Sequence, residues 1–375
     1  MGPRLAEDGT AGCTAESRRA GLQSAEAPAG AKGTAPRTQV EDGGSNDHFR
    51  VRMPASHPTF PLSRPARINL GPLLLATAAM GFVAPIRSQG QVPTVPPPAA
   101  QNPSPMVERT RAHTRLPQQD APGTRRTFTG PLERPVQVFV PSGTRTRTPR
   151  LVIHFHGAAF VAETAVSRMG SSYVGATVNL APGSGVYDRT FSNAAVYDTL
   201  LEGIAREVAV AVGRPVTFSR VTLVGFSAGH GAIRAILRDS SHFASVGGVL
   251  LLDGMHTSYV PEGTVVEKGG TLDERNLEAF VRFAQAAMRG EKRFVVTHSE
   301  IFPGTFASTT ETSDHLLQAL GLRRTPVLEW GPGGMQQLSE VRRGRLEILG
   351  FAGNSAPDHI DHLHGMPEFL RRVER

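Results

Sequence analysis

From about residue 130 onward, short apolar runs alternate with stretches whose apolar residues recur at helical spacing. Apolar, β-branched runs that are too short for a helix are typical of buried strands. Strands are predicted at residues 136–140, 151–156, 173–180, 221–224, 246–252, 293–297 and 346–349. Helices are predicted between or after them at residues 196–212, 228–238, 273–288, 311–320 and 367–373. This alternation predicts the α/β class, with a mostly parallel central sheet flanked by helices.

The beginning of the chain shows neither the short apolar runs of strands nor the helical spacing of apolar residues. Residues 1–52 are rich in Gly, Ala, Glu, Ser and Arg. Such a segment buries too little apolar surface to offset the entropy of ordering it. We interpret it as a disordered tail, or as the product of a start codon placed too far upstream, with Met53 as a later beginning.

Residues 53–88 have the pattern of a secretory signal. Arg64 and Arg67 precede an uncharged apolar stretch at residues 70–84 that contains several alanines. A basic region, an apolar region and small residues, in that order, are typical of a signal peptide. The stretch is short for a membrane-spanning helix and contains Pro72. We therefore expect export to the periplasm or the medium without stable membrane insertion, and keep an uncleaved membrane anchor as the alternative.

A Pro-rich segment follows at residues 89–125 and is predicted to be an extended linker. The folded domain is then expected to cover residues 126–375, a length that suits one large α/β domain. The net charge of +7 is spread over the whole chain, so no nucleic-acid partner is expected. Cys13 is the single cysteine, which excludes an internal disulfide and a thiolate-built zinc site. No phosphate-binding or dinucleotide fingerprint occurs, and no cofactor is expected.

The strongest chemical signal is the sequence Gly225-Phe226-Ser227-Ala228-Gly229 between a predicted strand and a predicted helix. Glycines at both ends allow a sharp turn in which the helix backbone passes close to the strand. Ser227 would then project above the sheet, next to free N–H groups at the start of the helix. The pattern G-x-S-x-G in this strand-turn-helix context indicates a nucleophilic serine.

Around residues 130–375 the chain resembles the α/β-hydrolase superfamily, specifically its esterase- and lipase-like serine hydrolases. The resemblance rests on four features that occur in the order Ser, acid, His: the strand that ends in His154-Phe155-His156-Gly157, the serine turn, Asp253 after the next strand, and a group of late histidines. It implies a Ser-His-acid triad and an oxyanion hole. The N–H of Ala228 is the expected first oxyanion donor, and that of Ala158 the expected second.

The resemblance leaves the acid and the base open between neighbours. Asp253 is the preferred acid because it closes an uncharged apolar run, and Glu300, after a later strand, is its rival. His359 is the preferred base and His362 its rival, with His364 third; all three are expected in the loop after residues 346–349. The predicted protein is an exported serine hydrolase that acts on small-molecule or lipid-like esters.

Two other functions remain open at this point. His154 and His156 point to one face of a strand and, together with His359, His362 and Asp361, would suit a metal-dependent hydrolase. The sequence after His156 does not continue as metal hydrolases usually do. A non-catalytic binding protein that retains the hydrolase fold is the second alternative, although no residue type of the triad is missing.

Overall fold

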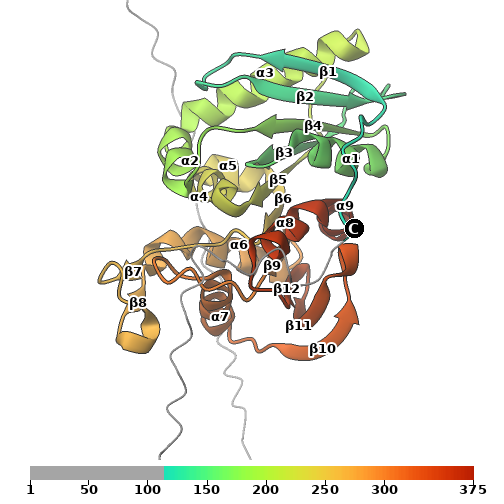
Figure 1. Cartoon of the computed structure of the whole chain (residues 1–375). Coiled ribbons are helices and arrows are strands. Elements are labelled where there is room, and N and C mark those ends of the chain that lie inside the picture. Colours follow the sequence, from blue (N-terminus) through green and yellow to red (C-terminus); the bar gives the residue numbers. More distant parts are fainter. Residues whose placement is uncertain (1–113) are drawn as a thin grey trace, which may run out of the picture. The chain divides into compact units, whose positions relative to one another are not determined.

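The computed structural model describes residues 114–375. The predicted tail, the predicted signal and most of the predicted linker lie outside this range. A ten-stranded sheet forms the centre of the described part (Figure 1), in the order β1-β2-β4-β3-β5-β6-β9-β12-β11-β10. The strands are β1 (Gly123–Phe128), β2 (Val136–Pro141), β3 (Arg150–Phe155), β4 (Tyr173–Val178), β5 (Arg220–Phe226), β6 (Val246–Leu252), β9 (Arg293–His298), β10 (Thr325–Trp330), β11 (Gln336–Arg343) and β12 (Leu346–Phe351).

The middle of the sheet is parallel and both of its edges are antiparallel. Strands β4, β3, β5, β6, β9 and β12 pair in parallel. The hairpin β1–β2 extends one edge, and the strands β11 and β10 extend the other. A separate two-stranded sheet, β7 (Tyr259–Val260) with β8 (Thr271–Leu272), lies in the long connection after β6. The predicted α/β class with a mostly parallel central sheet is confirmed.

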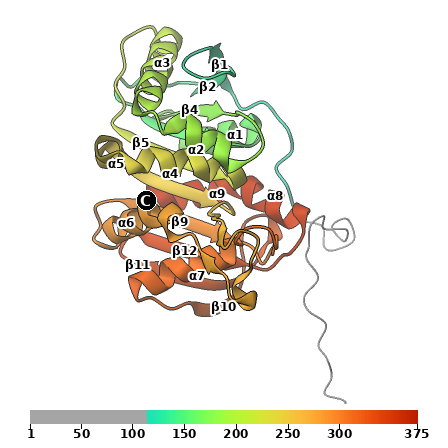
Figure 2. The ribbon, with the colours of Figure 1, turned by 90° about the vertical axis from the view of Figure 1, so that its left-hand side faces the viewer.

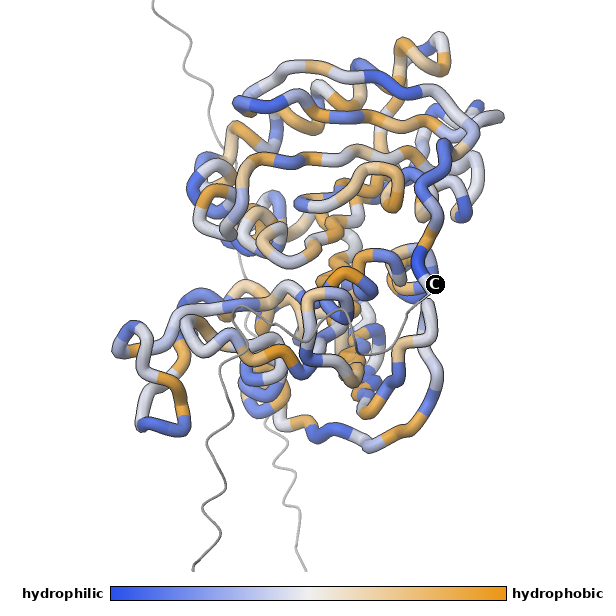
Figure 3. Tube along the Cα trace, in the orientation of Figure 1, coloured by the Kyte–Doolittle hydropathy of each residue, from blue (hydrophilic) through white to orange (hydrophobic). Residues whose placement is uncertain are grey.

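Helices cover both faces of the sheet (Figure 1, Figure 2), since the strands are buried on both sides. They are α1 (Ala159–Met169), α2 (Ser184–Phe191), α3 (Ala194–Val212), α4 (His230–Arg238), α5 (Ser240–Ser245), α6 (Glu278–Met288), α7 (Thr309–Leu320), α8 (Ala356–His364) and α9 (Met366–Glu374). Strand residues alternate between two cores: Leu151 and Ile153 pack with α3, α4, α6 and α7, whereas Val152 packs with α1, α8 and α9. In the hydropathy view (Figure 3), strongly hydrophilic stretches gather in outer turns and helix ends. Among the described residues, no helix combines the length and apolar character needed to cross a bilayer.

The structure differs from the sequence prediction at the edges of the sheet. Strands β10 and β11 are not predicted, because most of their residues are exposed or half-buried and carry polar side chains. Strand β1 begins at Gly123, so the expected domain start at Arg126 falls inside a strand. The late histidines lie on helix α8 and not in a loop, which corrects the expectation.

The segment before β1 packs on the helix that carries these histidines. Arg115 Nε donates to Asp361 Oδ1 at 2.7 Å, and the N–H of Leu116 donates to His364 Nδ1 at 3.0 Å. A capping box begins α8, with Ser355 Oγ accepting from the N–H of Asp358 and Asp358 Oδ2 accepting from the N–H of Ser355. Helix α8 is therefore fixed at its start by its own sequence and along its length by the chain before β1.

Candidate active site

Ser227 stands in a strained turn at the carboxyl end of β5. Its φ of 48° lies in the left-handed region, which non-glycine residues rarely adopt. A Cβ on Gly229 would lie 2.1 Å from the carbonyl oxygen of Phe155, and a Cβ on Gly254 would lie 2.6 Å from the backbone nitrogen of Ser227. The end of β3 and the segment after β6 therefore lie so close to the turn that only glycine fits at these two positions. This packing holds the serine side chain above the edge of the sheet.

Asp253 follows β6, the strand next to β5, and also has a positive φ, of 43°. Its carboxylate is buried and accepts four hydrogen bonds. Oδ1 accepts from the N–H of Ser299 at 2.9 Å and from Thr309 Oγ1 at 2.6 Å. Oδ2 accepts from Ser299 Oγ at 2.8 Å and from His359 Nδ1 at 2.7 Å. Three of the four donors belong to the segment after β9 and to α7, so the carboxylate is oriented independently of the histidine.

These contacts keep Asp253 ionised although it is buried. Burial by itself raises the pKa of this carboxyl group. The positive potential of His362, the hydrogen bond and charge of His359 and the hydrogen bond from Thr309 outweigh burial, and they hold the pKa of Asp253 well below its usual range. An ionised carboxylate only accepts hydrogen bonds, so His359 Nδ1 carries a proton and donates it toward Oδ2.

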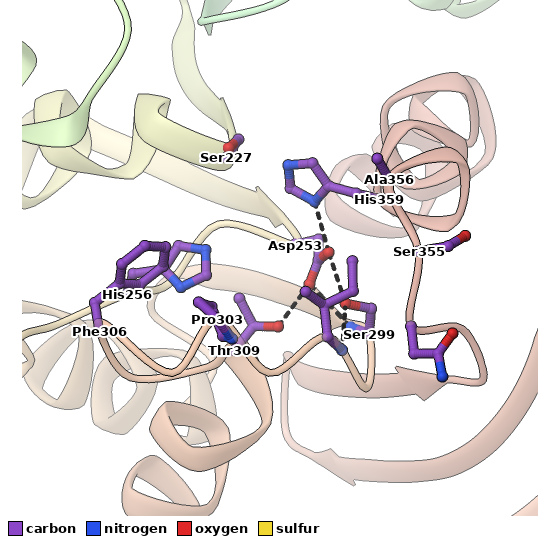
Figure 4. Close-up of a pocket in the computed structure, with 12 residues that line it drawn as sticks. Ser227, Asp253, His256, Ser299, Pro303, Phe306, Thr309, Ser355, Ala356 and His359 are labelled. Atoms are coloured by element: carbon purple, nitrogen blue, oxygen red, sulfur yellow. Dashed lines mark hydrogen bonds and ion pairs between the residues drawn. The ribbon is translucent and has the colours of Figure 1, made fainter. Parts of the chain in front are cut away.

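His359 links the acid to the serine side of the site. Its imidazole packs against Phe226, with ring centroids 4.6 Å apart, and its side chain retains 23% exposure. In Figure 4 the ring lies between Ser227 and Asp253, and its second nitrogen, Nε2, is turned toward Ser227. Within the described chain no hydrogen bond yet joins Ser227 to His359. Both side chains line the same cavity of about 250 Å³, which gives an incoming carbonyl group access to them.

The rival residues lie elsewhere. His362, one turn further along α8, is buried, shares a hydrogen bond of 2.8 Å with Thr297 Oγ1 and packs edge-on against Phe351. Glu300 is exposed and bonds the backbone of Gly353. Neither residue lines the cavity that contains Ser227. The structure therefore brings together Ser227, Asp253 and His359 from the predicted set.

The loop after β3 is braced by side chains of the segment between β4 and the middle of α2. His156 and Gly157 have φ values of 68° and 134°. The amide of Asn179 accepts from the N–H of Gly157 and donates to its carbonyl oxygen, both at 2.9 Å. Tyr187 contacts His156 Nδ1 at 3.1 Å. Sequence reasoning missed these bracing roles of Asn179 and Tyr187.

The Asn179 clamp decides which N–H groups remain for an oxyanion. The N–H of Gly157 is occupied by the clamp. Ala158 directly precedes α1, and Ala228 lies in the first turn of the 3₁₀ segment Ser227–Gly229, where backbone N–H groups have no partner within the helix. These are the two donors that the sequence predicts.

The residues of the predicted metal alternative point to different partners. His154 is fully buried, and burial, with a smaller effect of His156, lowers its pKa to about 3. His156 contacts Tyr187, His362 contacts Thr297 and Asp361 contacts Arg115. Within residues 114–375, no group of three or more His, Cys, Asp or Glu side chains is arranged to hold a metal ion. The geometry does not favour the metal-dependent alternative.

A second, larger cavity of about 690 Å³ is also lined by Ser227. Ser227, His256 and Phe306 line both cavities. The rings of His256 and Phe306 lie 5.0 Å apart, edge to face, in the wall that the two cavities share. The smaller cavity has an apolar side made by Ile301, Pro303, Phe306 and Ala356. The larger cavity is lined by polar groups that include Arg234 and Asn276.

The chain thus combines a mixed, mostly parallel sheet with a strained serine turn at the carboxyl end of β5. The serine, the acid and the histidine follow one another in that order along the chain. The chain has the α/β-hydrolase fold. No protein-family model matches the sequence, and no curated protein matches it. Among solved structures the chain is similar to an esterase from Pyrobaculum calidifontis, with a TM-score of 0.40, 13% identity, and coverage of 68% of this chain and 86% of that one.

Two further similar structures are also esterases. A bacterial heroin esterase has a TM-score of 0.38 and 15% identity, over 67% of this chain and 84% of its own. A thermostable esterase from Pseudomonas putida ECU1011 has a TM-score of 0.39 and 12% identity, over 69% of this chain and 83% of its own. Likenesses at this level carry no argument about chemistry, which has to be read from the residues of this chain.

Proposed function

We propose that this protein is a serine hydrolase that cleaves carboxylic esters. One arrangement carries the proposal. The His359 imidazole donates to the ionised Asp253, whose carboxylate accepts four hydrogen bonds, and Ser227 stands on a strained turn in the same cavity. A serine is a weak nucleophile unless a base takes its proton, and the base needs an orienting partner. The nucleophile, the base and the orienting partner each have a matching residue here.

The reaction follows from the geometry in two halves. Ser227 Oγ attacks the ester carbonyl carbon while its proton passes to His359 Nε2, and the carbonyl π electrons move onto the oxygen. The oxyanion collapses, the C–O bond to the alcohol breaks, and the alkoxide oxygen takes the proton from His359. A water molecule then repeats the sequence on the acyl-enzyme, releases the acid and regenerates Ser227.

Both charges that develop during the reaction, the imidazolium and the oxyanion, have stabilising groups beside them. The imidazolium that forms on His359 is stabilised by the carboxylate of Asp253, to which it is already hydrogen-bonded. The oxyanion is assigned to the N–H groups of Ala228 and Ala158. Loss of one such donor typically costs about 3–4 kcal/mol in barrier height. Because the Asn179 clamp holds the Gly157 peptide, the Ala158 donor is positioned before substrate arrives.

A fluorophosphonate probe tests the proposal directly, because only an activated serine reacts with it readily. We expect the full chain to be labelled at Ser227 and to hydrolyse p-nitrophenyl esters, and Ser227→Ala to lose both properties. Ser258→Ala is the matched control, since Ser258 lies in the wall of the larger cavity and should leave labelling unchanged. Absence of labelling in folded protein would favour the non-catalytic alternative. Inactivation by a chelator with restoration by zinc would favour a metal enzyme.

We also propose that the chain is exported. The support is the sequence pattern of residues 53–88, a basic region followed by an apolar stretch. N-terminal sequencing of the protein recovered from the periplasm or medium of an expressing bacterium tests this. A mature terminus near residue 88 is expected. Recovery of the intact chain from the cytoplasm would contradict export, and recovery of the intact chain from the membrane fraction would indicate the uncleaved anchor.

A further inference from the structure

The two cavities divide an ester between them, on the assumption that the proposed function holds. The departing alcohol oxygen must receive the proton of His359, so the alcohol occupies the cavity that His359 lines, which is the smaller one. Its apolar side suits a short alkyl group. The larger cavity does not include His359 but does include Ala228, the oxyanion donor, so the acyl chain extends into it.

Arg234 is the charged group of the acyl-side cavity. It is about nine-tenths buried, with 8% exposure, and lines the cavity wall. Its Nε donates to Asp188 Oδ2 at 2.6 Å. Among the described residues this is its one hydrogen-bonded partner. The planar guanidinium fork beyond Nε therefore retains donors on Nη1 and Nη2 for a ligand.

The charges around Arg234 leave a positive balance. Asp188 is shared, because its Oδ1 accepts from Arg238 Nη1 at 3.0 Å. Two guanidinium groups against one carboxylate leave one positive charge. Asp273, whose pKa is lowered mainly by its hydrogen bond to Arg275 and slightly by Arg234, is already neutralised by Arg275 through two hydrogen bonds of 2.9 Å. A second cation, Arg189, lies beside the wall, since a Cβ on Gly185 would be 3.2 Å from its Nη1.

The arginine also shares a cavity with the nucleophile. Ser227 and Arg234 both line the larger cavity, and Arg234 belongs to α4, the helix that follows the serine turn. Helical side chains lean toward the N-terminus, so the guanidinium leans back toward the serine.

We propose that the preferred substrates are short-chain alkyl half-esters of dicarboxylic acids, whose free carboxylate binds Arg234 while the ester carbonyl lies at Ser227. A monovalent, planar carboxylate matches the single net charge and the fork of the guanidinium. Asn276 lines the same cavity and offers a polar contact along the acyl chain.

The test compares pairs of substrates that differ only in charge. Monoethyl succinate, adipate and suberate are each paired with the analogue in which a primary amide replaces the free carboxylate. For at least one chain length we expect kcat/KM to favour the carboxylate by tenfold or more, the effect of one charged hydrogen-bonded contact. Arg234→Gln should remove the preference and leave the amide analogues little changed. Arg238→Gln is the matched control, because Arg238 contacts the same Asp188 but does not line the cavity.

The possible failures are distinguishable. Equal kcat/KM for carboxylate and amide at every chain length would overturn the substrate assignment and leave the esterase proposal intact. A preference for the carboxylate that persists in Arg234→Gln would likewise overturn the substrate assignment and leave the esterase proposal intact. If no ester is turned over at all, calorimetric titration of the Ser227→Ala protein with the adipate half-ester still decides the question. Binding that disappears in the Ser227→Ala/Arg234→Gln double variant supports the carboxylate site, and absence of binding to the Ser227→Ala protein overturns it.

Discussion

Arg115 Nε donates to Asp361 Oδ1 across 2.7 Å, and this contact joins the chain before the first strand to the helix that carries His359. The arginine side chain is 40% exposed, whereas that of Asp361 is 2% exposed. Its Nη2 also donates to the carbonyl oxygen of Pro357 at 2.9 Å, in the first turn of α8. The position of the candidate base therefore depends on residues that the sequence places in a linker.

Shortening the chain tests this dependence. A chain that begins at Thr114 should keep the melting temperature and activity of the longer protein, because it retains the contacts of Arg115 and Leu116 to α8. A chain that begins at Arg126 loses half of β1 as well as Arg115. We expect a melting temperature several degrees lower and a reduced kcat. Circular dichroism melts and ester assays on both chains provide the comparison.

Arg115→Ala separates the two losses in the shorter chain. Removing one partner of a charged hydrogen bond should cost about 1–3 kcal/mol of unfolding free energy. Arg145→Ala, in the exposed turn after β2, is the control and should be neutral. An Arg115→Ala protein as stable and active as the original would show that α8 is held by its own packing.

The assignment of acid and base predicts a rank order of damage. His359→Ala should reduce kcat/KM the most, by about 10⁴-fold or more, because the base itself is gone. Asp253→Asn should come next, since it leaves the imidazole without its orienting anion. Glu300→Gln should be close to neutral. Steady-state kinetics on one ester give the order, and His359→Ala retaining activity would refute the assignment.

His362→Ala should affect folding more than chemistry. The side chain is buried, bonds Thr297 and packs on Phe351. We expect its loss to cost about 2–4 kcal/mol of unfolding free energy, with a smaller change in kcat than for His359→Ala. Urea unfolding measured beside kinetics distinguishes the two effects. A well-folded but silent His362→Ala protein would transfer the role of base to His362.

The serine turn predicts a sharp difference between two glycines. Gly229→Ala would drive a methyl group to 2.1 Å from the carbonyl oxygen of Phe155, which has no room to move within the sheet. We expect a loss of about 3 kcal/mol or more and little probe labelling. Gly213→Ala is the control: its φ is 72°, but nothing lies within 4 Å, so it should cost only about 1 kcal/mol. Equal losses in thermal unfolding would show that the turn tolerates a side chain.

Three buried histidines should make the fold sensitive to acid. Burial, as the largest cause, lowers the pKa of His154, His230 and His298 to about 3 in each case. The unfolded chain binds these protons near pH 6.5. Stability is therefore full above about pH 6.5 and falls as the pH drops toward 3, by up to about 1.4 kcal/mol per pH unit for each histidine.

His154→Leu isolates one of these protons. The slope of unfolding free energy against pH, measured by urea titration between about pH 4 and 6, should decrease by about one proton. Ile153→Leu, at the neighbouring buried position, changes packing without changing titration and should keep the slope. A slope that is identical in His154→Leu and in the original chain would mean that His154 does not titrate in this window.

The sequence predicted the fold best at positions where a single physical requirement determines the residue type. The central strands are apolar on both faces, so their pattern identified them, and the glycines around Ser227 indicated the sharp turn. Strands β10 and β11 escaped because exposed edge strands carry polar residues that resemble loops. Helix α8 escaped although Ser355 and Asp358 have the spacing of a capping box, because the resemblance led us to expect the late histidines in a loop.

In the candidate site, too, some residues could be predicted from the sequence and others could not. Ser227, Asp253 and His359 follow from the order of motifs along the chain, but the choice between His359 and His362 depends on which ring reaches Asp253. That is a matter of three positions on a helix, which no periodicity resolves. Asn179 bonds Gly157 and Arg234 bonds Asp188, partners 22 and 46 positions away along the chain, so these contacts become visible only when the chain is folded.

The hydrogen bonds of Asp253 have one more consequence. Ser299 and Thr309 supply three of its four donors, and none of them depends on His359. Removing the imidazole by substitution with alanine should therefore leave a preformed anionic socket open to solvent beside Ser227. Such a socket matches free imidazole in shape and charge, so we expect imidazole supplied from solution to take the place of the His359 side chain as the proposed base.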